Sequence, residues 1–510
     1  MTVTLRGAGL AEEQVVAVAR NREQVALAPA ARTRMERSRI RAERASASRE
    51  PVYGVSTGFG ALAGTRVAPL RQPELQLALV RSHAAGVGPP VDVEVVRAMM
   101  LLRARTLSMG FSGVRPAVAE ALIAALNAEV TPVVPRYGSV GCSGDLAPLA
   151  HMALALVGEG QVTTGDGATK PAASALRGAG LKLLKLETKE GLALINGTDG
   201  MLGMLALACA DAELLFRTAD VTAAMSIEAL LGTDRPFLSH LQELRPHPGQ
   251  VASASNLVAL LKDSDIVASH RHSAHAVQDS YSVRCSPQVA GAARDTLDFA
   301  RRVAEVELAS AVDNPVVLEN GSVESTGNFH GEPLAFAADF MAIAAAEVGS
   351  ISERRVDRLL DPQRSQGLPP FLAEEPGVNS GLMVAQYTAA ALVAENRRLA
   401  APASVDSIPT SGMQEDHVSM GWGAALKLRS VLDNLANILA VELLASARGL
   451  DFRSPLKPSA ATAAVRELVR RDVKGPGADR FVAPELAAAT ALVRGGAVVA
   501  AAQKVLGRLA

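Results

Sequence analysis

Apolar residues recur at intervals of three and four positions along most of this chain, a spacing that places them on one face of an α-helix. The pattern predicts helices over residues 95–107, 116–126, 146–157, 199–231, 288–311, 333–360, 382–399 and 420–448. Several of the longer segments are apolar on more than one face, as in 436–444. A helix of that kind is buried in a larger bundle, which other copies of the chain can complete.

The strand pattern is weak and confined to short pieces at 133–135 and 316–318. Polar connectors rich in glycine and proline separate the apolar segments, at residues 54–70, 128–144, 232–287 and 401–418. We therefore expect a mostly α protein. A mixed N-terminal domain would cover residues 1–200 and carry the reactive loop described below, and a long-helix bundle with a C-terminal helical region would cover 201–510.

Charge and composition narrow the class of partner. The chain has 51 basic and 52 acidic residues without a long run of either sign, which argues against nucleic acid or an anionic membrane as a partner. Its three cysteines are widely spaced, as in a reduced cytoplasmic protein. The first residues lack the apolar core of a signal peptide, and the most apolar stretch, 201–210, runs into charged residues too soon to span a bilayer.

The tripeptide Cys142-Ser143-Gly144 can react with itself. Attack of the Gly144 amide nitrogen on the Cys142 carbonyl carbon closes a five-membered ring. Loss of two waters, one of them the Ser143 hydroxyl, leaves an exocyclic methylidene, which is an electrophile. Glycine suits the third position because a Cβ would obstruct the approach of its nitrogen, and Gly138 and Gly141 allow the unusual dihedrals that the loop requires.

The same nine residues, 138–146, also have ordinary explanations. Ser143 or Asp145 can cap a helix that has Pro148 in its first turn. A loop of glycine and serine at a helix N-terminus can equally bind an anion. Taken alone, the segment leaves these alternatives open.

Other polar side chains stand in the connectors, where function often resides. Tyr53 lies in a glycine-rich turn, His83 stands among small residues, and Asn196 lies where an apolar run breaks. Each also has a structural explanation, as a tyrosine over a loop, a satisfied core histidine or a helix cap.

One short stretch contains an amide, a phenol and a guanidinium, from Gln278, Tyr281 and Arg284. The arginine could bind a substrate carboxylate with both arms of its fork, or merely pair with Asp279. The segments 328–331 and 414–417 complete the set of polar connectors.

The histidines at positions 270, 272 and 275 could suggest a metal site. No acidic or cysteine ligand accompanies them at a familiar spacing, so no metal site is predicted.

Together these segments resemble the aromatic amino acid ammonia-lyase family, and within it the bacterial branch that acts on histidine. The similarity covers nearly the whole chain and runs through YGVSTGFG from Tyr53, SHAAGVG from Ser82, GSVGCSGDLAPLAH from Gly138, NGTDGM from Asn196, VQDSYSVRC from Val277, DNP from Asp313, GNFHG from Gly327 and QEDHVSM from Gln414. So many motifs in order, at compatible spacings, make chance agreement negligible.

The resemblance implies the helical fold of the fumarase/aspartase-like superfamily and a homotetramer in which three chains form each site. It also implies that Cys142-Ser143-Gly144 becomes 4-methylidene-imidazol-5-one (MIO) autocatalytically, so that no external cofactor is required. Cys142 stands where many members have alanine, but only its backbone carbonyl enters the ring. Ser56 and Met413 replace asparagines common in the family and put only fine tuning in doubt.

The resemblance further implies conversion of L-histidine to trans-urocanate and ammonia, the first step of histidine degradation. The methylidene carbon of Ser143 would take the substrate amine, and Tyr53 would remove the β-proton as the catalytic base. Tyr281 and Gln278 would hold and polarise the prosthetic group, and Asp145 would assist cyclisation.

The family also suggests how the substrate is held. Arg284 would clamp the carboxylate, and Asn196 would bind near the amine or carboxylate. His83 and Glu415 would recognise the imidazole, since a carboxylate can accept its ring N–H. Phe329 would pack against the substrate or the prosthetic ring.

Three other functions stay open. An aromatic 2,3-aminomutase uses the same electrophile but returns the amine to the β-carbon, and a tyrosine ammonia-lyase differs in the recognition of the ring. A silent helical scaffold would keep the fold without cyclising the tripeptide.

Overall fold

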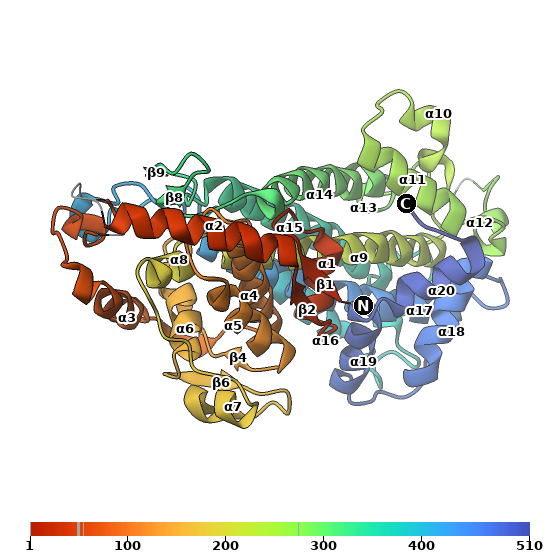
Figure 1. Cartoon of the computed structure of the whole chain (residues 1–510). Coiled ribbons are helices and arrows are strands. Elements are labelled where there is room, and N and C mark those ends of the chain that lie inside the picture. The colour runs from red at the N-terminus through yellow and green to blue at the C-terminus, as the bar shows by residue number, and fades with distance from the viewer. Residues whose placement is uncertain (1, 48–51, 55, 274) are drawn as a thin grey trace. The chain divides into compact units, whose positions relative to one another are not determined.

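The structure, a computed structural model, describes residues 2–47, 52–54, 56–273 and 275–510 (Figure 1). It confirms the predicted mostly α fold class. The chain divides into two compact units, each built from separate stretches. Unit 1 comprises Met1–Leu207, Ala300–Asp339 and Pro402–Leu426, and unit 2 comprises Ala208–Phe299, Phe340–Ala401 and Lys427–Ala510.

The long helices are where the apolar periodicity predicts them, with ends that differ by a few residues. Four of them contribute residues to both units: α9 (Asp199–Ala229), α14 (Ser286–Ala309), α15 (Glu332–Leu360) and α17 (Gly421–Phe452). Each of these helices is long because its apolar pattern continues through the interior turns. No proline or glycine there is strong enough to end the helix.

Unit 1 holds the remaining N-terminal helices and short 3₁₀ turns. These are α1 (Glu12–Ala19), α2 (Pro29–Ser46), α3 (Gln72–His83), α4 (Val93–Ser108), α5 (Pro116–Asn127), α6 (Leu146–Leu156), α7 (Ala172–Gly178), α8 (Glu190–Ile195), η1 (Gly60–Leu62), η2 (Pro69–Arg71) and η5 (Ser411–Met413).

Every strand among the described residues lies in unit 1. The strands are β1 (Val3–Leu5), β2 (Val25–Leu27), β3 (Val87–Pro90), β4 (Thr131–Pro132), β5 (Pro135–Tyr137), β6 (Gln161–Thr163), β7 (Thr169–Pro171), β8 (Val316–Val317) and β9 (Val323–Glu324). β1 pairs in parallel with β2; the antiparallel pairs are β3 with β5, β6 with both β4 and β7, and β8 with β9. The strand predicted at 133–135 is partly wrong, because it falls between β4 and β5.

Helix α4 forms the core of unit 1, between α1 and α5. Every residue from Val95 to Ser108 is buried, including three arginines. The Arg97 guanidinium donates to the carbonyl oxygens of Val18 and Leu126, which lie in the last turns of α1 and α5. These carbonyls compensate its buried charge. Arg103 does the same nearer the cavity described below.

Unit 2 contains the other helices: α10 (Ser239–Gln242), α11 (Pro248–Leu260), α12 (Asp265–Ser269), α13 (Tyr281–Arg284), α16 (Met383–Leu399), α18 (Ala460–Asp472), α19 (Ala483–Arg494), α20 (Ala497–Leu506), and the turns η3 (Arg235–Phe237) and η4 (Pro370–Leu372). The prediction of a connector over 232–287 is therefore wrong in part. Helix α11 escapes the apolar pattern because its buried face is polar: Ser253 and Asn256 donate to the buried Asp220 carboxylate at 2.6 and 2.8 Å.

A buried carboxylate ties the bundle of unit 2 together. Glu442 accepts hydrogen bonds from Arg355 at 2.5 and 2.9 Å, and from the hydroxyls of Thr222, Ser226 and Ser352 at 2.6–2.9 Å. A buried charge with this many donors is fully compensated, and removal of either ionic partner would leave the other uncompensated.

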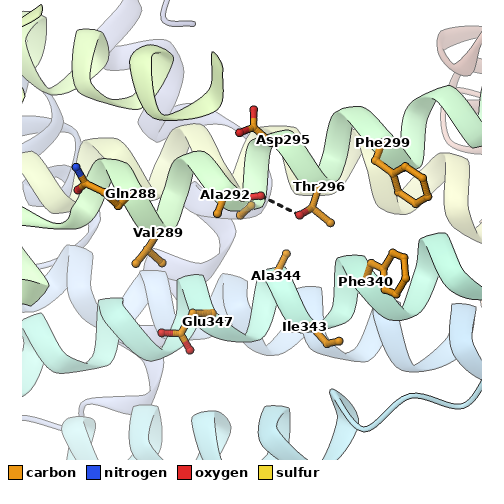
Figure 2. A pocket seen from close by; sticks show the side chains of 11 residues that line it. Gln288, Val289, Ala292, Asp295, Thr296, Phe299, Phe340, Ile343, Ala344 and Glu347 are labelled. Atoms are coloured by element: carbon orange, nitrogen blue, oxygen red, sulfur yellow. Dashed lines mark hydrogen bonds between the residues drawn. The ribbon is translucent and has the colours of Figure 1, made fainter. Parts of the chain in front are cut away.

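Among the described residues, α15 and α17 are long and apolar enough to cross a membrane by length and composition alone, and the bent pair α19 and α20 would pass the same test if the two formed one span. The most apolar window of α17 is 78% buried inside the protein, but that of α15 only 56%. In unit 2, α15 and α14 border an apolar groove of about 630 Å³ (Figure 2). Phe299 faces Phe340 there, with ring centroids 5.8 Å apart, and Ile343 remains 45% exposed.

Candidate active site

Unit 1 contains a cavity of about 450 Å³. It is lined by Tyr53, Gly58, Phe59, Gly60, Ala61, Leu62, Leu75, Ala78, Leu79, Ser82, His83, Ser143, Leu146, Leu192, Ile195, Asn196, Asn314, Ser411 and Glu415. Segments far apart in the sequence thus bring together five of the predicted site residues. Val55, which belongs to the first motif, lies outside the described residues.

The loop before α6 approaches a second stretch of backbone at Gly144. The φ of Gly144 is +75°, and a Cβ there would overlap the carbonyl of Gly197. Gly144 and Gly197 form a β-bridge, and the next amide, that of Asp145, donates to the Gly197 carbonyl oxygen at 2.7 Å. Only glycine satisfies both the dihedral and the close approach at this position.

The other side of the loop is held by the segment that leads into α17. The Ser419 hydroxyl donates to the Gly141 carbonyl oxygen at 3.1 Å, and the Met420 amide donates to the Val140 carbonyl oxygen at 2.9 Å. Trp422 donates its indole N–H to the Arg136 carbonyl oxygen at 2.8 Å. The loop is therefore fixed on both sides, which suits a tripeptide whose backbone must bend on itself.

Asp145 is the first residue before α6, but its side chain does not cap that helix. Its Oδ2 instead accepts the amide hydrogens of Gly200 and Met201, at 2.8 and 3.0 Å, in the first turn of α9. Burial raises the pKa of Asp145 to about 7. The Asp145 side chain thus links the reactive loop to the N-terminus of a different helix through these two hydrogen bonds.

Asn196 ends α8 and is 2% exposed. The Asn196 Nδ2 donates to the Asn314 carbonyl oxygen at 2.7 Å, and Arg103 donates to the backbone carbonyl oxygen of Asn196 at 2.7 Å. The side-chain oxygen of Asn196 is buried without a hydrogen-bond partner. It is a fixed acceptor on the cavity wall, which an ammonium group can satisfy.

Two acceptors lie on another part of the wall. Nδ1 of His83 is 2.9 Å from the Leu79 carbonyl oxygen, which can only accept, so Nδ1 carries the proton and Nε2 is left as an acceptor. Burial lowers the pKa of His83, which favours this neutral ring. Glu415 accepts from the Thr410 hydroxyl at 2.9 Å.

The Cys142 thiol interacts with this Glu415 carboxylate. Burial, and then the negative charge of Glu415, raise the pKa of Cys142 to about 12. The sulfur therefore stays protonated at neutral pH. Tyr53 enters the cavity from the glycine-rich turn, and its hydroxyl oxygen accepts the Gly60 amide hydrogen at 3.3 Å.

Three predicted residues belong to unit 2 and form a cluster of their own. Arg284 donates to the Gln278 side-chain oxygen at 2.6 Å, and its guanidinium carbon lies 4.8 Å from the centre of the Tyr281 ring. Tyr281 is 72% exposed. Phe329, in unit 1, is half-buried and does not line the cavity.

Asn314, Thr410 and Arg103 each hold a cavity residue in place, although no role is predicted for them from the sequence. Asn314 belongs to the DNP motif, which could have indicated that it lies near the site. The buried Lys189 pairs with Asp313 at 3.0 Å and so holds the motif in place. The other two act through carbonyl or hydroxyl contacts that no local pattern reveals.

A family model described as aromatic amino acid lyase matches residues 10–471. The chain belongs to the aromatic amino acid lyase family. This lyase is 57% identical to a histidine ammonia-lyase of Streptomyces avermitilis over 510 residues, covering 100% of both chains, and 48% identical to one of Gloeobacter violaceus, covering 99% of this chain and 98% of the other.

Solved structures agree on the fold of this carbon–nitrogen lyase. Tyrosine aminomutase of Streptomyces globisporus superposes with a TM-score of 0.94 at 39% identity, covering 100% of both chains. Histidine ammonia-lyase of Trypanosoma cruzi superposes with a TM-score of 0.91 at 40% identity, covering 99% of this chain and 95% of the other.

Proposed function

We propose that this lyase converts L-histidine to trans-urocanate and ammonia in the cytoplasm, using MIO formed from Cys142-Ser143-Gly144. The observation that carries the proposal is one cavity in which Ser143 and the unpartnered oxygen of Asn196 lie with two acceptors, His83 and Glu415. The curated relatives of 48–57% identity that cover nearly the whole chain are histidine ammonia-lyases.

The residues around the tripeptide fit the prosthetic group. Gly144 lies so close to Gly197 that there is no room for a Cβ. Asp145, the residue after it, is held by a hydrogen bond from the Gly200 amide to its carboxylate. When formed, the group supplies an electrophile that no unmodified side chain offers.

The cavity residues divide the remaining work. Asn196 Oδ1 accepts a hydrogen from the α-amino group and orients it toward Ser143. Tyr53 acts as the base in its phenolate form: the oxygen, which already accepts the Gly60 N–H, takes the β-proton and the side chain becomes a neutral phenol. Holding both groups fixes the reacting bonds in register, an effect worth several kcal/mol, on the order of 7–11 in well-aligned systems.

Recognition of the imidazole follows from the two acceptors. His83 Nε2 and the Glu415 carboxylate both accept N–H groups, so a protonated imidazole, with two N–H donors, satisfies both. A phenyl ring offers neither acceptor a donor: it would leave His83 Nε2 without a partner and Glu415 with only the Thr410 hydroxyl, which disfavours an apolar ring in this half-buried part of the cavity.

The substrate carboxylate needs a cation, and none of the described residues that line the cavity is a lysine or arginine. We infer that Arg284 of another copy supplies it, already oriented by Gln278 and Tyr281. This arrangement requires an oligomer, and the exposed apolar groove between α14 and α15 supports a homotetramer in which a second copy covers it (Figure 2).

The proposal is tested by supplying histidine, tyrosine and phenylalanine side by side and following urocanate by absorbance. We expect urocanate from histidine, a protein mass lower than the sequence mass by two waters, and loss of both in Ser143→Ala. Faster turnover of tyrosine or phenylalanine, or full activity without the mass deficit, would contradict the proposal.

The similarity to a tyrosine aminomutase at a TM-score of 0.94 makes an aminomutase the second candidate. Mass spectrometry of the products distinguishes the two. A β-amino acid in place of urocanate and ammonia would establish the aminomutase.

A further inference from the structure

A cluster of two histidines and a glutamate lies outside the catalytic cavity of unit 1. His330 and Glu332 flank Gly331 at the start of α15, and His417 lies in the connector after η5. One ligand atom from each of the three side chains lies within 4.8 Å of the other two. The proposed function uses none of the three.

The spacing of the imidazoles matches that of metal ligands. His330 Nε2 and His417 Nδ1 are 3.2 Å apart. In a tetrahedral site with metal–nitrogen bonds of about 2.0–2.1 Å, neighbouring ligand nitrogens are separated by about 3.3–3.4 Å. Without an ion, the two nitrogens share a hydrogen bond at this distance, and a shared cation would replace that hydrogen with little change in their spacing.

Glu332 supplies the second observation. Its Oε2 is buried without a hydrogen-bond partner, 3.9 Å from His330 Nδ1. An unsatisfied buried carboxylate oxygen is costly. A cation beside the rings would satisfy this oxygen.

We propose that His330, Glu332 and His417 bind one divalent transition-metal cation, with Zn²⁺ as the reference ion. Two imidazole nitrogens and one carboxylate oxygen form a donor set suited to zinc, cobalt or nickel and ill suited to magnesium or calcium. Three protein ligands leave at least one position for water.

The backbone around the ligands is fixed before any ion binds. A Cβ on Gly331 would overlap the Met201 sulfur, so the glycine is packed tightly between His330 and Glu332. The His330 amide also donates to the Gly327 carbonyl oxygen at 2.9 Å. The cation would join this segment to the one that carries Glu415, two residues before His417, and so stabilise a wall of the cavity.

In the sequence, the histidines at positions 270, 272 and 275 are the candidates for metal ligands. In the structure, His270 Nε2 and His275 Nε2 lie 3.0 and 3.1 Å from the carbonyl oxygens of Gly232 and Leu231. Those nitrogens are engaged with backbone. The new cluster has no familiar spacing, because its third ligand comes from a distant segment.

The test uses the full-length protein, freed of metal with a chelator and titrated with Zn²⁺ by calorimetry and with Co²⁺ by visible absorption. We expect one ion per chain. Loss of a group that merely orients a metal ligand costs 10–100-fold in affinity, so Glu332→Gln and His417→Ala should each weaken binding by about 100-fold or more. The exposed His240→Ala is the matched control and should bind as the unaltered protein does.

Glu332→Gln preserves the side-chain volume, so it keeps the test valid even if His417→Ala disturbs the fold. The proposal fails if the unaltered protein binds neither ion at micromolar concentration, or if Glu332→Gln binds both normally. A thiolate charge-transfer band with Co²⁺ would assign the ion to a cysteine and would also overturn it.

Discussion

The guanidinium of Arg284 is held in place before any substrate arrives. Gln278 accepts from one arm and the Tyr281 ring lies beneath the plane. Lysine keeps the charge but loses the fork. We predict that Arg284→Lys lowers kcat/KM for histidine by roughly 10–100-fold, the equivalent of a lost charged hydrogen bond of about 1.5–3 kcal/mol. Steady-state kinetics measure it, and a near-normal rate would remove Arg284 from the carboxylate site. Arg271→Lys, on the surface, is the control.

Glu415 tests recognition of the ring. Glu415→Gln keeps the size of the side chain but replaces one acceptor oxygen with a donor N–H. We predict that kcat/KM for histidine falls by at least about 10-fold while the low rates with tyrosine and phenylalanine do not fall in parallel. Competition assays with all three amino acids measure the ratio. An unchanged preference for histidine would show that Glu415 does not contact the imidazole.

At the scale of elements, the reactive loop depends on its contact with the end of α8. Gly144→Ala introduces a Cβ where φ is +75° and where the Gly197 carbonyl leaves no room. The left-handed conformation alone costs an alanine about 1–2 kcal/mol. We predict that this variant keeps its helical circular dichroism but loses both activity and the two-water mass deficit.

Gly178→Ala is the control for that substitution, because nothing lies within 4 Å of a Cβ there. It should retain the mass deficit. A Gly144→Ala protein that still loses two waters would show that the loop can move away from Gly197 without harm.

Asp145 joins α6 to α9, and its pKa makes that joint dependent on pH. Its pKa is about 7 in the folded protein and about 4 when unfolded, so the folded state holds the proton more tightly. The contribution of Asp145 to the free energy of unfolding is therefore full below about pH 4. It is lost as the pH rises to about 7, and the total loss is up to roughly 4 kcal/mol. Asparagine does not titrate, so the Asp145→Asn protein does not share this loss. The thermal midpoint of the variant should therefore rise relative to that of the unaltered protein as the pH increases from about 4 to about 7.

Thermal unfolding at pH 5 and pH 8 measures the gain, with the exposed Asp406→Asn as the control. A constant difference between the Asp145→Asn and unaltered midpoints would mean that Asp145 ionises normally.

Local patterns predicted the elements that bury apolar faces, and they failed where burial is polar. The long helices follow from apolar spacing, whereas α11 hides Ser253 and Asn256 against Asp220 and looks like a connector. Some candidate site residues within motifs, such as His83 and Asn196, do line the cavity. The contacts of Asp145 with the start of α9 were not, because the partners are backbone amides more than 50 residues away.

At the scale of the whole molecule, the apolar groove of unit 2 bears on assembly. The groove between α14 and α15 exposes apolar side chains on a helix whose apolar window is only 56% buried (Figure 2). Ile343→Asp places a charge in this groove. If a second copy covers it, burying that charge is prohibitive, so we predict particles smaller than the proposed homotetramer, together with loss of activity.

Light scattering coupled to size-exclusion chromatography measures the particle mass against the 52.9 kDa chain. Val505→Asp is the control, since Val505 is also 45% exposed but lies on α20, away from the groove. A tetrameric, active Ile343→Asp protein would move the interface elsewhere.

The high pKa of the Cys142 thiol has a consequence for durability. Sulfur reacts with alkylating agents and oxidants as the thiolate, and with a pKa of about 12 almost none is present at neutral pH. A protein that generates an electrophile within its own backbone risks self-inactivation by any neighbouring nucleophile. Burial and the Glu415 carboxylate keep the nearest thiol, Cys142, protonated, so inactivation by iodoacetamide would point to the part-exposed Cys285 instead.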